Sequence, residues 1–338
     1  MPDLTVWLLA ATILVALGFD FTNGFHDTAN AVSTVIGTRA LPPRIAIGVS
    51  ATLNLLGAVV ATQVLHTKVA NTIGGLVAPK ESIALGFIIA ALVGAIVWNL
   101  VTWRAGLPSS SSHALIGGLV GMGLAAYGTR AIKIDKLWPT VVALVTSPIA
   151  GLIVAYLLMV FLSNVLRGVH PGPANRTFRL LQLLSSSFVS FSHGANDSQK
   201  TMAVITLALV STHVVKKFAV PWWVVIIAAA AIGLGTYAGG WRIIRTMGQR
   251  IIRLEPINGF VAETVGAAVI QGATQLALPV STTHVVSGAV MGSGAPRGLA
   301  AVRWGVARSI AIAWILTIPA SAIVAAALTL ALRVFIRA

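Results

Sequence analysis

Residues 108–121 read PSSSSHALIGGLVG, and residues 279–292 read PVSTTHVVSGAVMG. Both stretches place a proline, a run of hydroxyl residues and a histidine before a glycine-rich apolar segment. The start of a helix offers free backbone N–H groups and the positive end of the helix dipole, and neighbouring hydroxyls add donors, so such a stretch can hold an anion. Ordinary N-capping is the alternative for one run alone. The occurrence of two runs favours an anion site.

Two further pairs of motifs indicate an internal repeat. GFHDTANA at 24–31 matches GANDSQKT at 194–201, which begins 170 residues later, and the hydroxyl runs lie 171 residues apart. Between them, Gly-Phe pairs at 86–87 and 259–260 are each followed by a Gly-Ala pair. Internal repeats in membrane proteins are typical of transporters, which place their site at the repeat interface near the middle of the membrane.

The composition excludes an ordinary soluble protein. Hydrophobic residues make up 57% of the 338 residues and charged residues 9%, whereas soluble domains carry about 25% charged residues. Long apolar runs also exclude a disordered or collagen-like chain. Because the chain has no cysteine, it has no disulfide framework, thiolate metal site or cysteine nucleophile. We therefore expect a chain embedded in a lipid bilayer.

Ten apolar spans are present, most of them long enough to cross a bilayer as helices. Two of them, 108–127 and 279–294, fit half-helices or re-entrant hairpins that line a cavity. Two others are expected to be interrupted, at Asp20–Asn30 and at His193–Lys200, because glycine lets a helix break there. The spans are 4–38, 44–66, 82–103, 108–127, 137–162, 180–212, 220–241, 257–277, 279–294 and 301–332.

The predicted fold is an all-α polytopic membrane protein with two inverted repeats, broken helices and re-entrant hairpins. We expect span 82–103 to pair with 108–127 as a hairpin, and span 257–277 to pair with 279–294 in the same way. Each half of the chain then crosses the membrane an odd number of times. The second repeat is therefore inverted relative to the first. The predicted divisions are a first membrane repeat at 1–162, a basic cytoplasmic linker at 163–179 and a second membrane repeat at 180–338.

The charge balance is 23 Lys+Arg against 8 Asp+Glu. In a soluble protein this would suggest nucleic acid. Here the basic residues lie at the ends of apolar spans, where they anchor helices and set topology, so no nucleic-acid partner is expected. The linker shares its side of the membrane with Arg39, Arg44 and the arginines of 242–253, and this bias assigns that side to the cytoplasm. The predicted location is the cytoplasmic (inner) membrane, crossed several times.

Four carboxylates fall inside apolar spans: Asp20, Asp27, Asp197 and Glu263. An intramembrane carboxylate costs at least about 2.5–3.5 kcal/mol on insertion scales, so it needs a wet cavity, a cation or a proton. Asp27 and Asp197 occupy equivalent positions in the repeats, which favours a transport role over a structural ion pair. A structural role is favoured for Asp20, and Glu263 is a candidate for proton or cation coupling.

Polar side chains surround both repeated aspartates. Asparagine, serine and threonine supply oxygen ligands of the kind that sodium or magnesium prefers, and helix capping is a compatible alternative. Four histidines lie in the motifs: His26, His113, His193 and His284. A buried histidine is often structural, but His113 and His284 follow the hydroxyl runs directly and are the favoured candidates for contact with the anion or for proton relay.

An enzyme is not expected. The chain has no HExxH, CxxC or Walker-type motif, and we predict no cofactor. An intramembrane serine hydrolase built from Ser112 or Thr283 with the following histidine is a remote alternative. Hydrolases need one asymmetric nucleophile–base pair, whereas this chain duplicates every element.

At these motifs the sequence resembles the PiT inorganic phosphate transporter family, and the resemblance covers essentially the whole chain. It rests on the repeated GFHDTANA and GANDSQKT, on PSSSSH and PVSTTH, and on EPINGFVAE at 255–263. The resemblance implies an electrochemically driven symporter of inorganic phosphate that forms a homodimer. It implies cation ligands at Asp27, Asn30, Asn196 and Asp197, and phosphate ligands at Ser110, Ser111, Ser112, Ser281, Thr282 and Thr283.

Three residues depart from the family pattern: Lys200 and His26 stand where asparagine is common, and Asn54 stands where many sodium-coupled members have glutamate. These changes resemble bacterial low-affinity permeases that co-transport protons, sometimes with metal-phosphate complexes. Lys200 lies three residues past Asp197, so the two are neighbours on a helix. Its ammonium would occupy the place of a sodium ion. The prediction is therefore proton coupling.

Three alternatives stay open: a sodium-coupled phosphate symporter, a sulfate permease of the same fold, and a passive anion channel. If sodium or another cation is bound, Asp27, Asn30 and Asp197 are its predicted ligands. The predicted coupling residues are Asp27, Asn30, Asn196, Asp197, Lys200 and Glu263, and the predicted phosphate site is Ser110–His113 with Ser281–His284.

Overall fold

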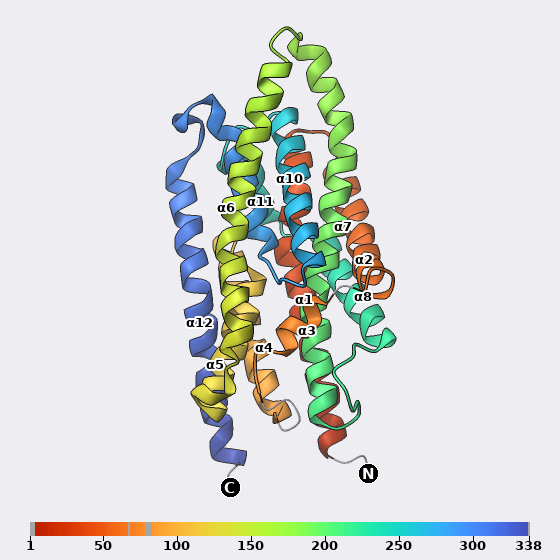
Figure 1. The fold of residues 1–338 in the computed structure, drawn as a ribbon, viewed down its shortest axis with the longest axis vertical. Helices are drawn as coiled ribbons and strands as arrows, with labels where there is room; N and C mark the ends of the chain where they lie inside the picture. Colours follow the sequence, from red (N-terminus) through yellow and green to blue (C-terminus); the bar gives the residue numbers. More distant parts are fainter. Residues whose placement is uncertain (1–3, 67, 79–82, 337–338) are drawn as a thin grey trace.

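The computed structural model describes residues 4–66, 68–78 and 83–336, so the outermost residues of both predicted repeats and of the span that starts at 82 lie outside it (Figure 1). The described chain is built from helices. Their bounds are α1 (Leu4–Gly37), α2 (Pro43–Gln63), α3 (Val69–Gly74), α4 (Leu85–Ala105), α5 (Ser111–Tyr127), α6 (Ile134–Val165), α7 (Pro171–Ser211), α8 (Trp222–Ala238), α9 (Trp241–Arg245), the π-helical turn η3 (Thr246–Arg250), α10 (Pro256–Gln275), α11 (Thr282–Gly294) and α12 (Trp304–Ile336).

Five of these helices are long and apolar enough to cross a membrane: α1, α2, α4, α6 and α12. A sixth span results if α8 and the following α9–η3 segment count as one helix bent by 60°. Short single-turn 3-10 helices at 129–131, 295–297 and 299–301 connect the longer elements. The predicted all-α membrane fold is thus confirmed.

The two short helices α5 and α11 lie in opposite halves of the molecule (Figure 1), and their N-terminal ends lie next to each other. In Figure 1, α4 and α5 lie in the lower half with both chain termini, and α10 and α11 lie in the upper half, below the α6–α7 connection. The tips of the two hairpins meet, because Ser112 Oγ at the start of α5 donates a 2.8 Å hydrogen bond to the Val280 carbonyl just before α11. Opposed hairpins therefore bring the two hydroxyl runs together.

The structure corrects the expectation that two of the long helices are interrupted. Helices α1 and α7 run without a break through the GFHDTANA and GANDSQKT motifs. The motif glycines serve close packing instead: a Cβ on Gly24 would lie 2.3 Å from the Ile232 carbonyl oxygen, and one on Gly194 would lie 2.0 Å from that of Asn54. The predicted linker 163–179 is mostly helical, since only residues 166–170 connect α6 to α7.

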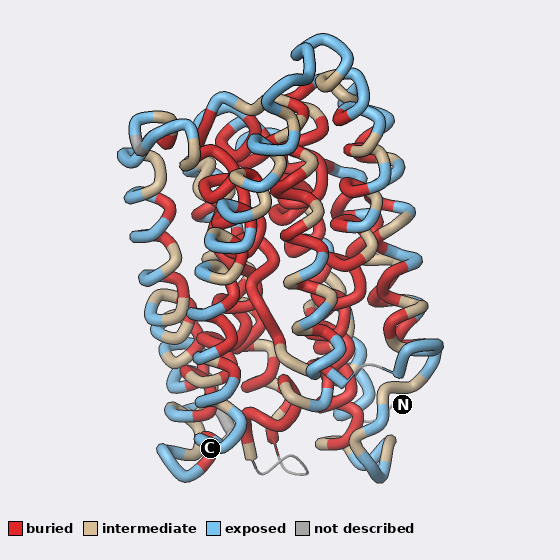
Figure 2. Tube along the Cα trace, turned by 45° about the horizontal axis from the view of Figure 1, so that its top comes forward, coloured by how far each residue is buried: buried red, intermediate tan, exposed pale blue. Residues whose placement is uncertain are grey.

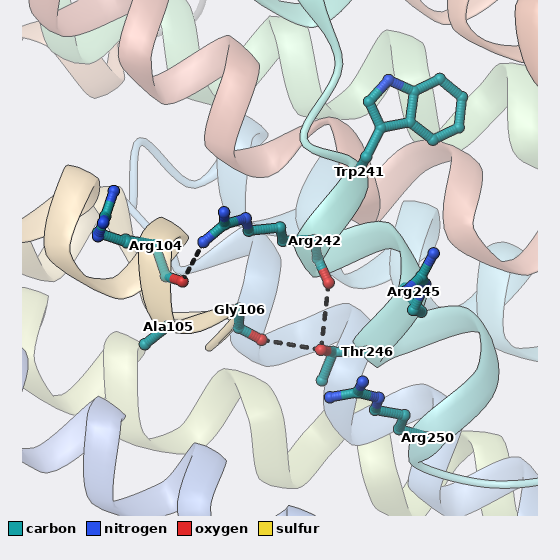
Figure 3. Close-up of a pocket in the computed structure, with 8 residues that line it drawn as sticks. All are labelled: Arg104, Ala105, Gly106, Trp241, Arg242, Arg245, Thr246 and Arg250. Carbon is teal, nitrogen blue, oxygen red and sulfur yellow. Dashed lines mark hydrogen bonds between the residues drawn. The ribbon is translucent and has the colours of Figure 1, made fainter.

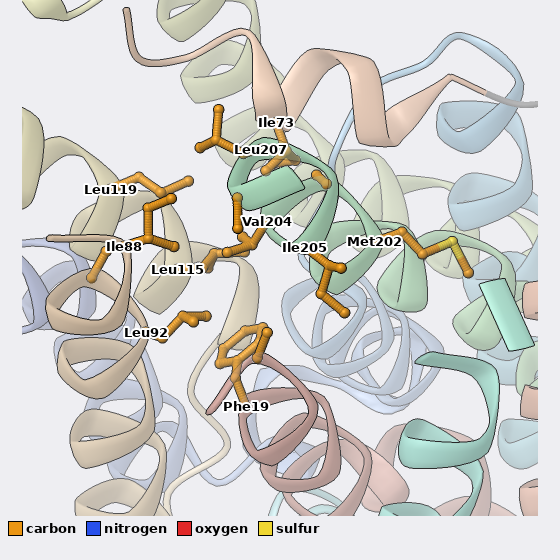
Figure 4. Packing of buried hydrophobic residues seen from close by; sticks show 14 of the residues in the cluster. Phe19, Ile73, Ile88, Leu92, Leu115, Leu119, Met202, Val204, Ile205 and Leu207 are labelled. Carbon is orange, nitrogen blue, oxygen red and sulfur yellow. The ribbon is translucent and has the colours of Figure 1, made fainter. Parts of the chain in front are cut away.

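Two apolar clusters hold the bundle together. Figure 2 shows that most of the buried backbone lies in the interior of the bundle, while exposed residues lie on its outer side and at its ends. The first cluster packs Phe19 of α1 and Leu92 of α4 with neighbours from α5 and α7 (Figure 4). The second joins α1, α6, α7, α10 and α11 around residues such as Val189 and Val286. Along α1 and α7 the buried residues between the clusters are largely polar, from Asp20 to Asn30 and from Ser190 to Thr201.

Gly194→Ala is expected to destabilise the protein by about 1–3 kcal/mol, because the added methyl group meets the backbone of α2 and forces two packed helices apart. Thermal unfolding of the purified protein in detergent measures the loss. The matched control is Gly48→Ala in α2, where an added Cβ meets no atom within 4 Å. Unfolding of the Gly194 variant at the wild-type temperature would contradict the tight α2–α7 contact.

Candidate functional site

The hydroxyl runs form matching N-termini on α5 and α11. Ser110 Oγ accepts a 3.1 Å hydrogen bond from the backbone N–H of His113, and Ser281 Oγ accepts a 3.2 Å bond from that of His284. The first N–H groups of each helix have no partner inside the helix. All six hydroxyl residues predicted for the anion site, Ser110–Ser112 and Ser281–Thr283, are at most 2% exposed. Two buried, positively polarised helix ends thus face one point, which suits an oxyanion.

These hydroxyls contact both repeated aspartates. Ser111 Oγ donates to Asp27 Oδ2 at 2.8 Å, and Thr283 Oγ1 donates to Asp27 Oδ1 at 3.1 Å. Thr282 Oγ1 donates to Asp197 Oδ2 at 3.3 Å. The structure therefore brings together the hydroxyl runs and the aspartates, which the sequence placed in four separate segments.

Asp27 and Asp197 lie within one small cluster of possible metal ligands. One ligand atom each from Asp27, Asp197 and His193 lies within 4.8 Å of the others, and all three residues are buried. Lys200 Nζ lies 2.7 Å from Asp197 Oδ1, and both side chains are fully buried. Asp20 on α1 is also fully buried.

Hydrogen bonds fix the orientation of His193. Thr236 Oγ1 donates to the Ile232 carbonyl at 2.9 Å and therefore accepts from Asn54 Nδ2 at 2.8 Å. Asn54 Oδ1 then faces His193 Nδ1 at 3.0 Å, so Nδ1 carries a hydrogen. The other ring nitrogen, Nε2, faces Asp197 Oδ2 at 3.5 Å. His193 is thus held with one nitrogen directed at the carboxylate.

His193 was not among the favoured histidines, although the sequence carried a signal for its contact with Asp197. His193 and Asp197 are four residues apart, and residues at this spacing share one face of a helix. His26 has a comparable place in the first motif: its Nδ1 lies 2.7 Å from Asp27 Oδ1, and its Nε2 lies 3.1 Å from Thr102 Oγ1. Each aspartate therefore has a histidine beside it.

The two predicted asparagines behave differently. Asn30 Nδ2 donates to Thr283 Oγ1 at 2.9 Å, so Asn30 belongs to the cluster around Asp27. Asn196 Nδ2 instead donates to Thr274 Oγ1 on α10 at 2.9 Å. The amide of Asn196 is directed towards α10, and its contacts do not place it among the aspartate ligands.

Glu263 forms a separate buried network between α1, α7 and α10. Its carboxylate accepts hydrogen bonds from Thr34 Oγ1 at 2.7 Å, Ser185 Oγ at 2.5 Å and Gln182 Nε2 at 3.1 Å. Gln182 Oε1 in turn accepts from Thr38 Oγ1 at 2.7 Å. This carboxylate is satisfied by its own donors and shares none of them with Asp27 or Asp197.

His113 and His284 face each other behind the two helix starts, with ring centroids 4.4 Å apart. His284 also stacks on Trp314 of α12 at 4.0 Å, and Trp314 Nε1 donates to the Pro108 carbonyl at 3.0 Å. The sequence did not indicate Trp314, because nothing in the chain order places α12 beside the hairpin tips. Its ring supports both the second histidine and the segment before the first hydroxyl run.

Comparisons with known proteins agree with this arrangement. A sequence model described as the phosphate transporter family matches residues 23–325. A Rhizobium meliloti (strain 1021) protein named "Probable low-affinity inorganic phosphate transporter" is 47% identical over 94% of this chain and 95% of its own length. A Bacillus subtilis (strain 168) protein of the same name is 40% identical over 95% of this chain and 96% of its own length.

A solved structure has the same fold. It is entitled "The sodium-dependent phosphate transporter", superposes with a TM-score of 0.86 and is 26% identical, covering 97% of this chain and 99% of its own. The family and these relatives are transporters rather than enzymes, which removes the serine-hydrolase alternative. The sequence match over nearly the whole length shows that this chain belongs to the phosphate transporter family.

Proposed function

We propose that this protein is a secondary active symporter that moves inorganic phosphate across the cytoplasmic membrane together with protons. The observation that carries the proposal is the contact of Ser111, Thr282 and Thr283 with the carboxylates of Asp27 and Asp197. Anion donors and proton acceptors thus share one buried site. A bound phosphate that keeps a proton can donate it to a nearby carboxylate, whereas sulfate has no proton to donate, so this pairing favours phosphate.

In this proposal the anion is held where α5 and α11 begin, and coupling takes place at the aspartates beside it. His193 joins the coupling group, and Glu263 on α10 is a further buried carboxylate proposed to take part in coupling. The proposed phosphate ligands are Ser110, Ser111, Ser112, His113, Ser281, Thr282, Thr283 and His284, and the proposed coupling residues are Asp27, Asn30, Asn196, Asp197, Lys200 and Glu263.

Lys200 supports protons over sodium as the coupling ion. Its ammonium already lies 2.7 Å from Asp197 Oδ1 and neutralises the charge that would attract a sodium ion. The orientation of His193 also supports protons, because a ring nitrogen rather than an oxygen faces Asp197 Oδ2, at 3.5 Å. Sodium prefers oxygen ligands, and the Asp27–His193–Asp197 cluster offers a nitrogen as one of its three.

Sodium coupling is the alternative with an observation in its favour. The solved structure with the same fold is entitled a sodium-dependent phosphate transporter, and the two buried aspartates of this chain lie close enough to share a cation. Phosphate uptake into proteoliposomes, with proton and sodium gradients imposed separately and sulfate as competitor, distinguishes the two. We expect accumulation with the proton gradient alone and weak competition by sulfate.

The proposal includes alternating access by two inverted repeats, residues 1–162 and 180–338, joined by the basic segment 163–179 on the cytoplasmic side. The meeting of the two hairpin tips at Ser112 and Val280 supports this division. We also propose that the protein works as a homodimer, as the family resemblance implies, and that metal-phosphate is a second form of the transported anion.

Ser111→Ala combined with Thr282→Ala is expected to weaken phosphate binding at least about tenfold, since each change removes a donor that would face a charged oxyanion. Equilibrium binding of radiolabelled phosphate to the purified protein measures this. The matched control is Thr52→Ala with Ser309→Ala, two exposed hydroxyls that bond only carbonyls of their own helices. Wild-type binding in the first double variant would remove the anion site from the hydroxyl runs.

A further inference from the structure

A cavity lined by basic residues lies at the end of α4. Its volume is about 280 Å³, and four arginines line it together with Trp241 and Thr246 (Figure 3). We call it the arginine pocket, after Arg104, Arg242, Arg245 and Arg250. Among the described residues, one arginine forms an ion pair with a carboxylate, and it is Arg297, which bonds Glu255. No described carboxylate therefore lies within 4 Å of the pocket guanidinium groups. The pocket therefore combines strong positive charge with no described counter-ion.

A bend and a π-helical turn in the backbone shape this pocket. The helix that starts as α8 bends by 60° before α9 and η3, at Gly239 with its positive φ of 73° and Gly240 packed closely on the Phe25 carbonyl. The bend turns the basic segment towards the end of α4. In η3 the backbone then adopts a π-helical turn, a feature that is frequent at functional sites.

One arginine is fixed in place and two are left free. Arg242 donates a 2.6 Å hydrogen bond to the Arg104 carbonyl, and its guanidinium lies 5.2 Å from the centre of the Trp103 ring. The side chains of Arg245 and Arg250 have no hydrogen bond or ion pair with any residue that the structure describes, and both are exposed. Free guanidinium groups with forked donors suit the oxygens of a phosphate group.

We propose that the arginine pocket binds a phosphate group, supplied by an anionic lipid headgroup or by inorganic phosphate. Three of its arginines belong to the basic segment 242–253, which the charge bias assigns to the cytoplasmic side. Both sources are present there, since the cytoplasmic leaflet is rich in anionic lipids. This site goes beyond the proposed transport mechanism and does not depend on it.

A ligand in the pocket would bear directly on the first hairpin tip. Thr246 Oγ1 donates to the Gly106 carbonyl at 2.8 Å, and Gly106 lies four residues before Ser110. On the other side, Trp103 packs against Phe25 at 4.9 Å, next to His26 and Asp27. The pocket therefore touches both segments that supply the first half of the transport site.

The test uses Arg245→Gln combined with Arg250→Gln, which leaves the fixed Arg242 untouched. The matched control is Arg44→Gln with Arg308→Gln, which removes the same charge from exposed positions outside the pocket. In the first arm, equilibrium binding of radiolabelled inorganic phosphate is measured in maltoside detergent. In the second arm, retention of phosphatidylglycerol from mixed-lipid nanodiscs is measured by native mass spectrometry.

We expect the pocket variant to bind one phosphate per chain fewer than wild type, or to retain phosphatidylglycerol at least about tenfold more weakly, while the control matches wild type. A fall in the first arm identifies inorganic phosphate as the ligand, and a fall in the second identifies the lipid headgroup. The pocket variant and the wild type have the same site between α5 and α11. The difference in binding between them therefore reports on the arginine pocket, whether or not phosphate binds at that other site. Binding equal to the control in both arms overturns the proposal.

Discussion

Replacing Asp27 with asparagine is expected to abolish gradient-driven accumulation of phosphate. Asp27 is the point where both hydroxyl runs meet, with Ser111 on one carboxylate oxygen and Thr283 and His26 on the other. An amide can neither take up a proton nor balance a cation, so the variant loses the charge change that couples the two fluxes. Radiolabelled phosphate uptake into proteoliposomes with an imposed pH gradient measures the loss.

Asp135→Asn is the matched control, because Asp135 is an exposed acid in the first turn of α6 and should be replaceable without effect. Asp197→Asn is expected to behave like Asp27→Asn, since its carboxylate contacts Thr282, His193 and Lys200 in the same buried site. If both variants still accumulate phosphate, the two aspartates are structural and coupling takes place elsewhere.

Lys200→Asn is expected to destabilise the protein by about 3–5 kcal/mol and to stop proton-driven accumulation. Lys200 and Asp197 are fully buried and paired at 2.7 Å, and removing one member of such a pair leaves a buried charge without its partner. The unbalanced Asp197 should then attract a cation. Thermal unfolding is therefore expected to show stabilisation of the variant by sodium, and no comparable effect of sodium on the wild type.

Two further variants separate charge from side-chain size. Lys200→Met keeps the length of the side chain and removes its charge, so it should lose a similar amount of stability. Lys200→Asn combined with Asp197→Asn removes both charges and should recover much of that stability, while accumulation stays absent. A Lys200→Asn variant that is as stable as wild type, and that still accumulates phosphate without sodium, would show that this ion pair does not set the coupling ion.

The sequence predicted the helices well because long apolar runs and hydroxyl N-caps are local signals. The run PVSTTH predicted the start of a short helix, and α11 begins at Thr282 with Ser281 as its cap. The glycines of the motifs were misread for the opposite reason. Whether Gly194 breaks a helix or admits a neighbour depends on the backbone of α2, which lies far away in the sequence.

The candidate site likewise contains residues that the sequence indicated and residues that it did not. Asp27, Asp197 and the hydroxyl runs were predictable because they occur twice at one spacing, and Lys200 because it is one helical turn from Asp197. The network around Glu263 combines side chains from α1, α7 and α10, so no single segment indicates it. The arginine pocket depends on the 60° bend after α8, which sequence periodicity does not register.

The hydroxyls between the aspartates have a consequence for stoichiometry. Each hydroxyl has one proton to donate, and Ser111, Thr282 and Thr283 direct theirs at carboxylates. If a phosphate accepts a hydrogen bond from one of these hydroxyls, Asp27 or Asp197 loses that hydrogen bond. Phosphate binding therefore exchanges hydrogen bonds to a carboxylate for hydrogen bonds to the anion. The carboxylate that loses a donor in a dry interior becomes costly unless a proton arrives with the phosphate. Under the proposed proton coupling, the number of protons moved per phosphate is set by how many hydroxyl donors the anion and the carboxylates share.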